Sequence, residues 1–326
     1  MVSPLHEDPD LEAGETAVVP MEFDGNRLDA AAAKLFDAYS RARIKTWIEV
    51  GRLLLNDAVC TVPRQPVKVG DRLQLSAETV QEVSLKPQNI ALDVVFADAH
   101  LAIINKPAGL TVHPGAGVRD GTLQNALLHH WPRTAEIPRA GLVHRLDKET
   151  TGLMVVALSE PAHTHLSAMM AARAVHREYD ALVNGALVSG GTVDAPIARH
   201  PRERVKMAVV MGGRDAVTHY RVAERFAWHT LLRVQLQTGR THQIRVHMAH
   251  LKYPVAGDPV YGGDVLRARG ASTRLRTAVG AFRRQALHAA ALSFDHPITD
   301  APLAFSMPRP ADFEALLKVL RQEPAT

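Results

Sequence analysis

The sequence contains one cysteine, Cys60, in 326 residues. A single cysteine can neither form a disulfide within the chain nor build a cysteine zinc site, which is typical of proteins in a reducing compartment. No apolar run approaches the roughly 18 residues that a membrane-spanning helix needs. Residues 1–10 also lack the basic-then-apolar pattern of a signal peptide. We therefore expect a cytoplasmic protein without a membrane partner.

Lysine and arginine are missing from the first 26 positions, which instead carry seven acidic side chains: Glu7, Asp8, Asp10, Glu12, Glu15, Glu22 and Asp24. Removing seven negative charges from the formal net charge of +4 leaves +11 on residues 27–326. Such a charge suits a polyanionic partner, but it also suits an ordinary soluble basic protein. Charge alone does not decide between these two interpretations.

The chain length corresponds to about two domains. Residues 1–26 show no helical or strand period and are predicted to form a disordered acidic tail. Residues 27–85 have two short helical patterns followed by short strands separated by turns, which predicts a small domain. Residues 90–310 are assigned to a second, larger domain, and residues 311–326 to a C-terminal helix and tail.

The larger domain is predicted to be α+β. Its strand-like runs are residues 92–96, 101–104, 153–157, 179–183, 217–222 and 230–237. Two helical patterns, near residues 163–174 and 241–251, interrupt these runs. Because strands and helices do not alternate regularly, a mixed sheet is favoured over a doubly wound parallel sheet.

Residues 141–156 place a dense polar turn between two apolar runs. This arrangement would hold Asp147 at the end of buried structure, with its carboxylate free to face a cleft. Taken alone, such an aspartate more often caps a turn by bonding its own backbone. A strand tyrosine such as Tyr179 is more often a core residue. The pattern around residue 245 puts Arg245 off the packed helix face, which suits a surface or a functional role equally.

Five segments in the same order resemble the RluA-type pseudouridine synthases. They are Ile104–Leu110, His144–Asp147 followed by Thr151–Gly152, Arg177–Tyr179, Thr238–His247 and Gly257–Gly262. Five ordered matches are very unlikely to arise by chance. The resemblance covers about residues 90–310 and implies a mainly antiparallel mixed sheet. Residues 27–85 are similar to the ribosomal-protein-S-four-type RNA-binding domain that often precedes this catalytic domain.

The resemblance implies an isomerase that converts uridine in RNA to pseudouridine. The reaction breaks the bond from ribose to the base nitrogen and rejoins the uracil through carbon 5, so no cofactor is expected. Asp147 is the implied catalytic carboxylate. It would attack the base or the anomeric carbon, or remove a sugar proton to give a glycal, and the sequence leaves these routes open. Arg245 is implied to pair with Asp147, and Tyr179 to stack on the flipped uracil.

Further residues are expected to bind RNA. The resemblance implies that Arg145 enters the RNA to displace the target base, since a stacked base is out of reach. Lys106 and Lys148 are expected to contact phosphates beside the cleft, and Arg240 and His242 are also assigned to RNA. A phosphate-binding patch is predicted in the small domain from four basic residues: Arg41, Arg43, Lys45 and Arg52.

No metal site is predicted. His242, His247 and His250 do not fall on one helix face, and no zinc-binding pattern accompanies them. The implied partner is large-subunit ribosomal RNA, free or in a pre-ribosomal particle, and the protein is expected to act as a monomer. Residues 113–117 and 138–141 most resemble the subgroup of the family that modifies this RNA, in the hairpin facing the decoding site.

Two other functions stay open at this point. The first is the same chemistry on another structured RNA, such as a transfer RNA. The second is an RNA-binding ribosome assembly factor without catalysis, although such a factor would need none of Asp147, Tyr179 and Arg245. A glycosidase is not supported, because that chemistry normally uses two carboxylates and only Asp147 has a motif around it.

Overall fold

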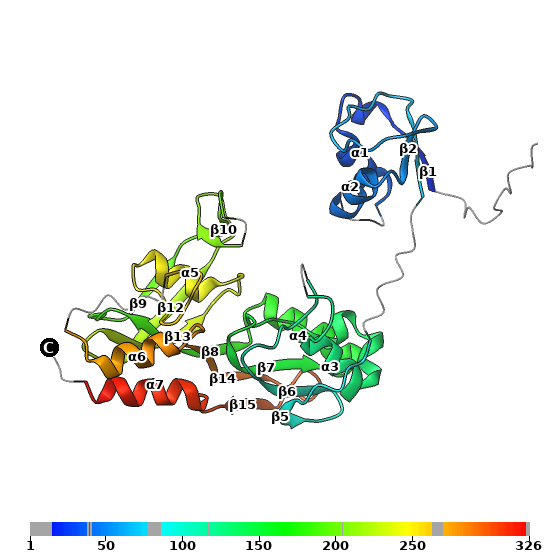
Figure 1. Ribbon diagram of the computed structural model, residues 1–326. Helices are drawn as coiled ribbons and strands as arrows, with labels where there is room; N and C mark the ends of the chain where they lie inside the picture. The colour runs from blue at the N-terminus through cyan, green and yellow to red at the C-terminus, as the bar shows by residue number, and fades with distance from the viewer. Residues whose placement is uncertain are drawn as a thin grey trace, which may run out of the picture. The chain divides into compact units, whose positions relative to one another are not determined.

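The computed structural model describes residues 15–37, 39, 41–76, 86–115, 118–203, 205–262 and 270–323. The chain divides into two compact units, residues 1–84 and 85–326 (Figure 1). No helix within the described ranges is long and apolar enough to cross a membrane.

The small unit is a four-stranded antiparallel sheet with two helices. Its strand order is β1-β4-β2-β3. The elements are β1 (Glu15–Val18), the 3-10 helix η1 (Met21–Phe23), α1 (Leu28–Leu35), α2 (Arg41–Glu49), β2 (Leu53–Leu55), β3 (Ala58–Val59) and β4 (Arg72–Leu75). Leu28, Ile44, Ile48 and Leu73 are completely buried between helices and sheet. These apolar positions recur at helical spacing along α1 and α2, so one face of each helix covers the sheet.

Part of the predicted disordered acidic tail is structured, because it contains β1. Residues 15–18 pair with β4, with Glu15 opposite Leu75, and η1 follows them directly. The prediction of disorder up to residue 26 is therefore wrong for residues 15–26, whereas residues 1–14 lie outside the described residues. A strand of only four residues has little local signal of its own, because its pairing partner comes much later in the chain.

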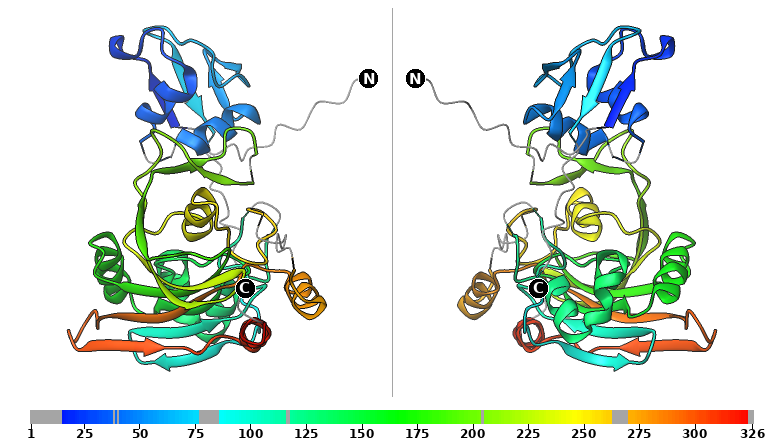
Figure 2. Two further views of the ribbon diagram at one scale, coloured as in Figure 1. Left: turned by 90° about the vertical axis from the view of Figure 1, so that its left-hand side faces the viewer. Right: turned by 90° about the vertical axis from the view of Figure 1, so that its right-hand side faces the viewer.

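The large unit is built on a nine-stranded mixed sheet (Figures 1 and 2). Its order is β5-β6-β7-β14-β8-β13-β12-β9, and β15 also pairs with β14. The strands are β5 (Asp93–Ala97), β6 (Leu101–Lys106), β7 (Thr151–Ala157), β8 (His176–Asn184), β9 (Gly191–Asp194), β12 (Val217–Arg225), β13 (His229–Leu236), β14 (Leu287–Asp295) and β15 (Pro302–Ser306). Only the β7–β14 pair among these is parallel, so the predicted mixed, mainly antiparallel α+β fold is confirmed.

Helices and one hairpin complete the large unit. The helices are α3 (Leu123–His130), the 3-10 helices η2 (Pro132–Glu136) and η3 (Pro138–Gly141), α4 (Glu160–Ala171), α5 (Gln243–His250), α6 (Thr273–Ala281) and α7 (Ala311–Arg321). β10 (Ile197–Arg199) and β11 (Met207–Val209) form a separate antiparallel hairpin beside α5 (Figure 1). The predicted helices near residues 163–174 and 241–251 correspond to α4 and α5.

β7 is the central strand for the site, and every one of its residues is buried. Leu153 and Val155 face a core that α4 covers. Met154 and Val156 face the main core on the other side of the sheet. Burial on both faces explains why this strand reads as a continuous apolar run without alternation. The polar turn that precedes β7 is consequently attached to a rigid part of the sheet.

Candidate active site

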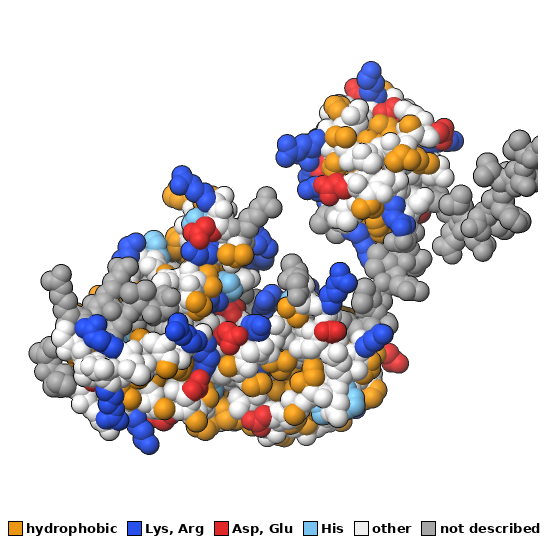
Figure 3. All heavy atoms as spheres, viewed as in Figure 1, with side chains coloured by type: hydrophobic (Ala, Val, Ile, Leu, Met, Phe, Trp, Pro, Cys, Tyr) orange, Lys and Arg blue, Asp and Glu red, His pale blue; other side chains and the backbone are white. Residues whose placement is uncertain are grey.

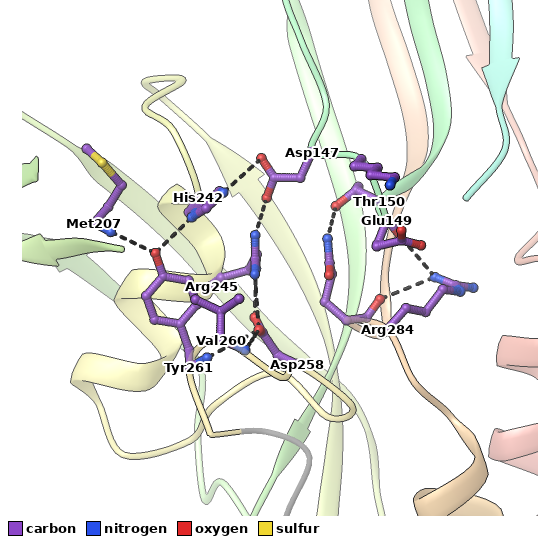
Figure 4. A network of polar contacts seen from close by, with 12 residues as sticks. Asp147, Glu149, Thr150, Met207, His242, Arg245, Asp258, Val260, Tyr261 and Arg284 are labelled. Carbon is purple, nitrogen blue, oxygen red and sulfur yellow. Dashed lines mark hydrogen bonds and ion pairs between the residues drawn. The ribbon is translucent and has the colours of Figure 1, made fainter. Parts of the chain in front are cut away.

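Asp147 lies in the turn that leads into β7. The turn is closed by a backbone hydrogen bond from Thr150 N–H to the carbonyl of Asp147 at 3.0 Å. The Asp147 carboxylate is directed instead to Arg245 on α5, whose Nη1 donates to Asp147 Oδ2 at 2.9 Å (Figure 4). The aspartate is thus held by a residue from a distant helix, and the turn-capping alternative does not apply.

Arg245 bridges two carboxylates. Its Nε and Nη2 donate to Asp258 at 2.6 and 3.0 Å. Asp258 is completely buried, and its Oδ1 also accepts the backbone N–H groups of Val260 and Tyr261. Burial by itself would lower the pKa of Arg245, but hydrogen bonds and charge from Asp258 and Asp147 outweigh it and raise that pKa. Arg245 therefore presents a permanent positive charge to Asp147.

The position of Arg245 differs from the sequence prediction. The helical pattern placed it off the packed face, yet the residue is only 4% exposed. The loop after α5 covers it, and the Tyr261 ring lies 5.0 Å from the guanidinium carbon. A loop that folds back over a helix leaves no trace in the helix's own periodicity, so the apolar stripe could not reveal this burial.

Tyr179, on β8, lines the same pocket as Asp147 and is 4% exposed. Burial, and to a lesser extent the charge of Asp147, raise the pKa of the Tyr179 phenol, so it keeps its proton at neutral pH. The pocket brings together six of the predicted site residues: Arg145, Asp147, Tyr179, Arg240, His242 and Arg245. Its apolar wall consists of Leu146, Leu236, Ile244 and Leu287. A pocket lined by both charged and apolar side chains suits a flat ring with polar edges.

Comparisons with known proteins show what this chain is similar to. Residues 100–250 match the family described as RNA pseudouridylate synthase, and residues 26–73 match the S4 domain. A relative from Pseudomonas aeruginosa, "Ribosomal large subunit pseudouridine synthase D", is 54% identical over 94% of this chain and 96% of its own length. A relative of the same name from Xanthomonas campestris is 52% identical over 95% and 93%.

This chain belongs to the RNA pseudouridylate synthase family. It is therefore an isomerase, with an RNA-binding S4 domain at residues 26–73. A solved human structure, "RNA Pseudouridylate Synthase Domain Containing 4", superimposes with a TM-score of 0.54 at 28% identity. The match covers 72% of this chain and 94% of the human chain.

The position of Lys106 differs from the prediction that it contacts RNA phosphates. The side chain is completely buried at the end of β6, and its Nζ donates to the carbonyl oxygens of Pro107, Leu110 and Lys148 at 2.7, 2.9 and 2.8 Å. Burial lowers its pKa to about 8, although the nearby charges of Glu149 and Asp147 oppose that shift. Because all three ammonium hydrogens are used inside the protein, Lys106 does not contact RNA phosphates.

Each of the three residues after Asp147 accepts a hydrogen bond from a side chain elsewhere in the large unit. Beyond the bond from Lys106 to the Lys148 carbonyl, Arg284 Nη1 donates to the Glu149 carbonyl at 3.4 Å. Gln285 Nε2 donates to Thr150 Oγ1 at 3.1 Å (Figure 4). Arg284 is itself fixed by two 2.8 Å hydrogen bonds to Asp312 on α7. No motif surrounds Arg284, Gln285 and Asp312, so the sequence did not indicate that these residues hold the turn.

The start of β7 also needs a close backbone approach. A Cβ atom at Gly152 would lie 2.2 Å from the carbonyl oxygen of Ala289 on β14, and Gly152 has φ of +110°. Only glycine fits at this contact. The match between Gly152 and the motif therefore reflects the packing of β7 against β14, which sets where the Asp147 turn begins.

Replacing Lys106 with methionine is expected to destabilise the large unit by about 2–4 kcal/mol, because three carbonyl groups lose their shared donor. Urea unfolding followed by circular dichroism would measure the loss. Lys148→Met is the matched control: this side chain is exposed, so its removal should change stability by less than about 0.5 kcal/mol. Equal stability of the two variants would contradict the structural role of Lys106.

His242 and Arg240 lie at the start of α5. His242 is a left-handed N-cap with φ of 58°, and its Nε2 is 3.9 Å from Asp147 Oδ1. Arg240 Nε donates to the carbonyl of Asp215 at 2.9 Å. Arg145 is exposed, with Nη1 3.2 Å from His113 Nε2. Contact of these three side chains with RNA stays a prediction.

His247 on α5 has a structural role. The two ring nitrogens of His247 bond Thr218 Oγ1 and the carbonyl of Ala195, each at 2.9 Å. In the part of the chain that the structure describes, no group of three or more histidine, cysteine or acidic residues is arranged to hold a metal ion.

The basic residues predicted in the small unit have partners within it. Arg41 Nη2 lies 3.2 Å from Asp29, and Lys45 Nζ lies 3.6 Å from Glu49. The Arg43 guanidinium stacks 5.4 Å above the Trp47 ring. The side chains of Arg41 and Lys45 are nevertheless more than half exposed. Figure 3 shows basic side chains spread over both units with acidic ones between them.

Proposed function

We propose that this synthase isomerises uridines of large-subunit ribosomal RNA, in the hairpin that faces the decoding site, with Asp147 as its key catalytic residue. The observation that carries the proposal is the convergence of Asp147, Arg245 and Tyr179 on one pocket. Its target is supported by relatives named for the ribosomal large subunit, which are 52–54% identical over more than nine-tenths of both chains.

The two carboxylate oxygens of Asp147 have different roles in this proposal. Oδ2 accepts the hydrogen bond from Arg245, which orients the carboxylate and balances its charge. Oδ1 is then the oxygen that acts on the bound uridine. It attacks the uracil ring or the anomeric carbon, or it takes a sugar proton. In each route the nitrogen-to-ribose bond breaks, a carbon-to-ribose bond forms at carbon 5, the carbon 5 proton leaves, the freed ring nitrogen takes up a proton, and the Asp147 carboxylate is regenerated.

RNA is held around this pocket by side chains at its mouth. Arg145 occupies the space of the displaced base, since unpairing the uridine requires something to enter the stack. Lys148 and Arg240 contact the flanking backbone. The S4 domain adds phosphate contacts through its basic side chains, including Arg41, Arg43, Lys45 and Arg52. The synthase works as a cytoplasmic monomer without a metal or organic cofactor.

Mapping pseudouridine in total RNA from cells with and without the gene tests the proposal. We expect modification to disappear at uridines in one large-subunit hairpin and to return with the wild-type gene. Loss confined to a transfer RNA would assign the other RNA substrate. An unchanged map would support the non-catalytic assembly factor instead.

Tyr179→Phe is expected to bind RNA nearly as well as the wild type and to lose most of its turnover. The phenylalanine ring preserves stacking, worth roughly 1–3 kcal/mol per base, whereas transfer of the carbon 5 proton needs the phenolic hydroxyl, which passes on its own hydrogen as it accepts that proton. Tyr179→Ala should lose both binding and turnover. Tritium release from carbon-5-labelled uridine, RNA affinity and a fluorescent base beside the target separate these effects. Wild-type tritium release by Tyr179→Phe would remove the hydroxyl from the chemistry.

A further inference from the structure

A chain of polar contacts reaches Asp147 from the β10–β11 hairpin. The backbone N–H of Met207 donates to the Tyr261 hydroxyl oxygen at 2.9 Å. That oxygen lies 2.8 Å from Nδ1 of His242, whose Nε2 is 3.9 Å from Asp147 Oδ1 (Figure 4). These contacts end at Oδ1 of the Asp147 carboxylate, whereas Arg245 binds Oδ2.

The direction of the hydrogens in this chain follows from its donors. Met207 N–H is a fixed donor, so it occupies a lone pair of the Tyr261 oxygen. Burial raises the pKa of Tyr261 and lowers the pKa of His242, so the phenol keeps its hydrogen and the imidazole is neutral. A neutral imidazole carries one N–H, on either ring nitrogen.

The two neighbours of the His242 ring, the Asp147 carboxylate and the Tyr261 hydroxyl, together select between the two tautomers. With the hydrogen on Nδ1, the His242 Nε2 lone pair would face the carboxylate, which is repulsive. With the hydrogen on Nε2, an N–H faces Asp147 Oδ1 and Nδ1 accepts the Tyr261 O–H. The Tyr261 O–H then has an acceptor and the His242 N–H faces the negative charge at 3.9 Å, so the second arrangement is favoured.

We propose that Tyr261 is a positioning residue, which locks His242 in the tautomer that directs its Nε2–H toward Asp147 Oδ1. The inference rests on the proposed catalytic role of Asp147. His242 then orients the reacting oxygen, while Arg245 orients the other one. The hydroxyl of Tyr261 supplies this function, and its ring separately covers Arg245.

The tautomer can be observed without substrate. Nitrogen-15 NMR of histidine-labelled full-length protein should show His242 protonated at Nε2 alone in the wild type. In Tyr261→Phe the ring contact with Arg245 is kept but the hydroxyl is gone, so His242 should sample both tautomers. Tyr253→Phe removes a phenolic hydroxyl that does not line the pocket and should leave the His242 signal unchanged. A single Nε2–H tautomer in Tyr261→Phe would overturn the inference.

Turnover on a large-subunit RNA hairpin gives the second measurement. Tyr261→Phe should lower kcat about fivefold with little change in KM, because the N–H that faces the Asp147 carboxylate at 3.9 Å is then present in only part of the molecules. In a His242→Gln background the side-chain amide offers an N–H without tautomers, so adding Tyr261→Phe should change kcat by less than about twofold. An equal loss in both backgrounds would show that Tyr261 acts by another route and would overturn the inference.

These outcomes separate the inference from the proposed function. A wild-type protein that does not modify the hairpin would refute the proposed target, while the NMR comparison would still decide the tautomer. An active wild type with an unaffected Tyr261→Phe variant would refute only the role of Tyr261.

Discussion

Asp147→Asn is expected to abolish pseudouridine formation, with turnover falling by about 10⁴-fold or more, while RNA affinity changes by less than about tenfold. Asparagine keeps the shape of the side chain and an oxygen that accepts the hydrogen bond from Arg245. It removes the negative charge that every proposed route requires. Arg245 stays compensated by the buried Asp258, so the pocket should remain folded.

Single-turnover assays on a large-subunit hairpin and filter binding to the same RNA would measure the two effects. Asp120→Asn is the control, because Asp120 is exposed and does not line the pocket. It should retain the wild-type rate. Turnover within tenfold of the wild type in Asp147→Asn would remove Asp147 from the chemistry.

Arg245→Met should eliminate turnover and also destabilise the large unit by about 3–5 kcal/mol, because it leaves the completely buried Asp258 as an uncompensated charge. Asp147 contributes less to this loss, since its side chain is 14% exposed and can be hydrated. Urea unfolding and the hairpin assay measure the two consequences independently.

A double variant separates stability from chemistry at this position. In Arg245→Met/Asp258→Asn the buried charge is gone, yet the asparagine oxygen can still accept the N–H groups of Val260 and Tyr261 that Asp258 binds. We expect most of the stability to return and turnover to stay absent. A double variant as unstable as Arg245→Met alone would mean that the unpaired Asp258 charge is not the cause.

The strands and helices that were predicted correctly are those whose hydrophobic pattern lies within their own residues. β7 reads as an apolar run because both of its faces are buried, and α4 and α5 have helical spacing. β14 was missed although it lies near the centre of the sheet. Its segment contains three alanines, a residue with weak strand preference. The neighbours β7 and β8 make it a strand, and they are distant in sequence.

The sequence by itself identified the chemistry of this protein, because the motifs around Asp147, Tyr179 and Arg245 are contiguous and can be read one residue at a time. Only the tertiary structure decided what each charged side chain contacts. Lys106 turned out to be a buried clamp, and Asp258 the second partner of Arg245. The sequence does not distinguish a lysine that faces water from one that donates to three buried carbonyl groups. The contact between Asp147 and Arg245 joins residues 98 positions apart. Charge pairing in a protein interior depends on which distant segments exclude water together, and that is a property of the packed fold.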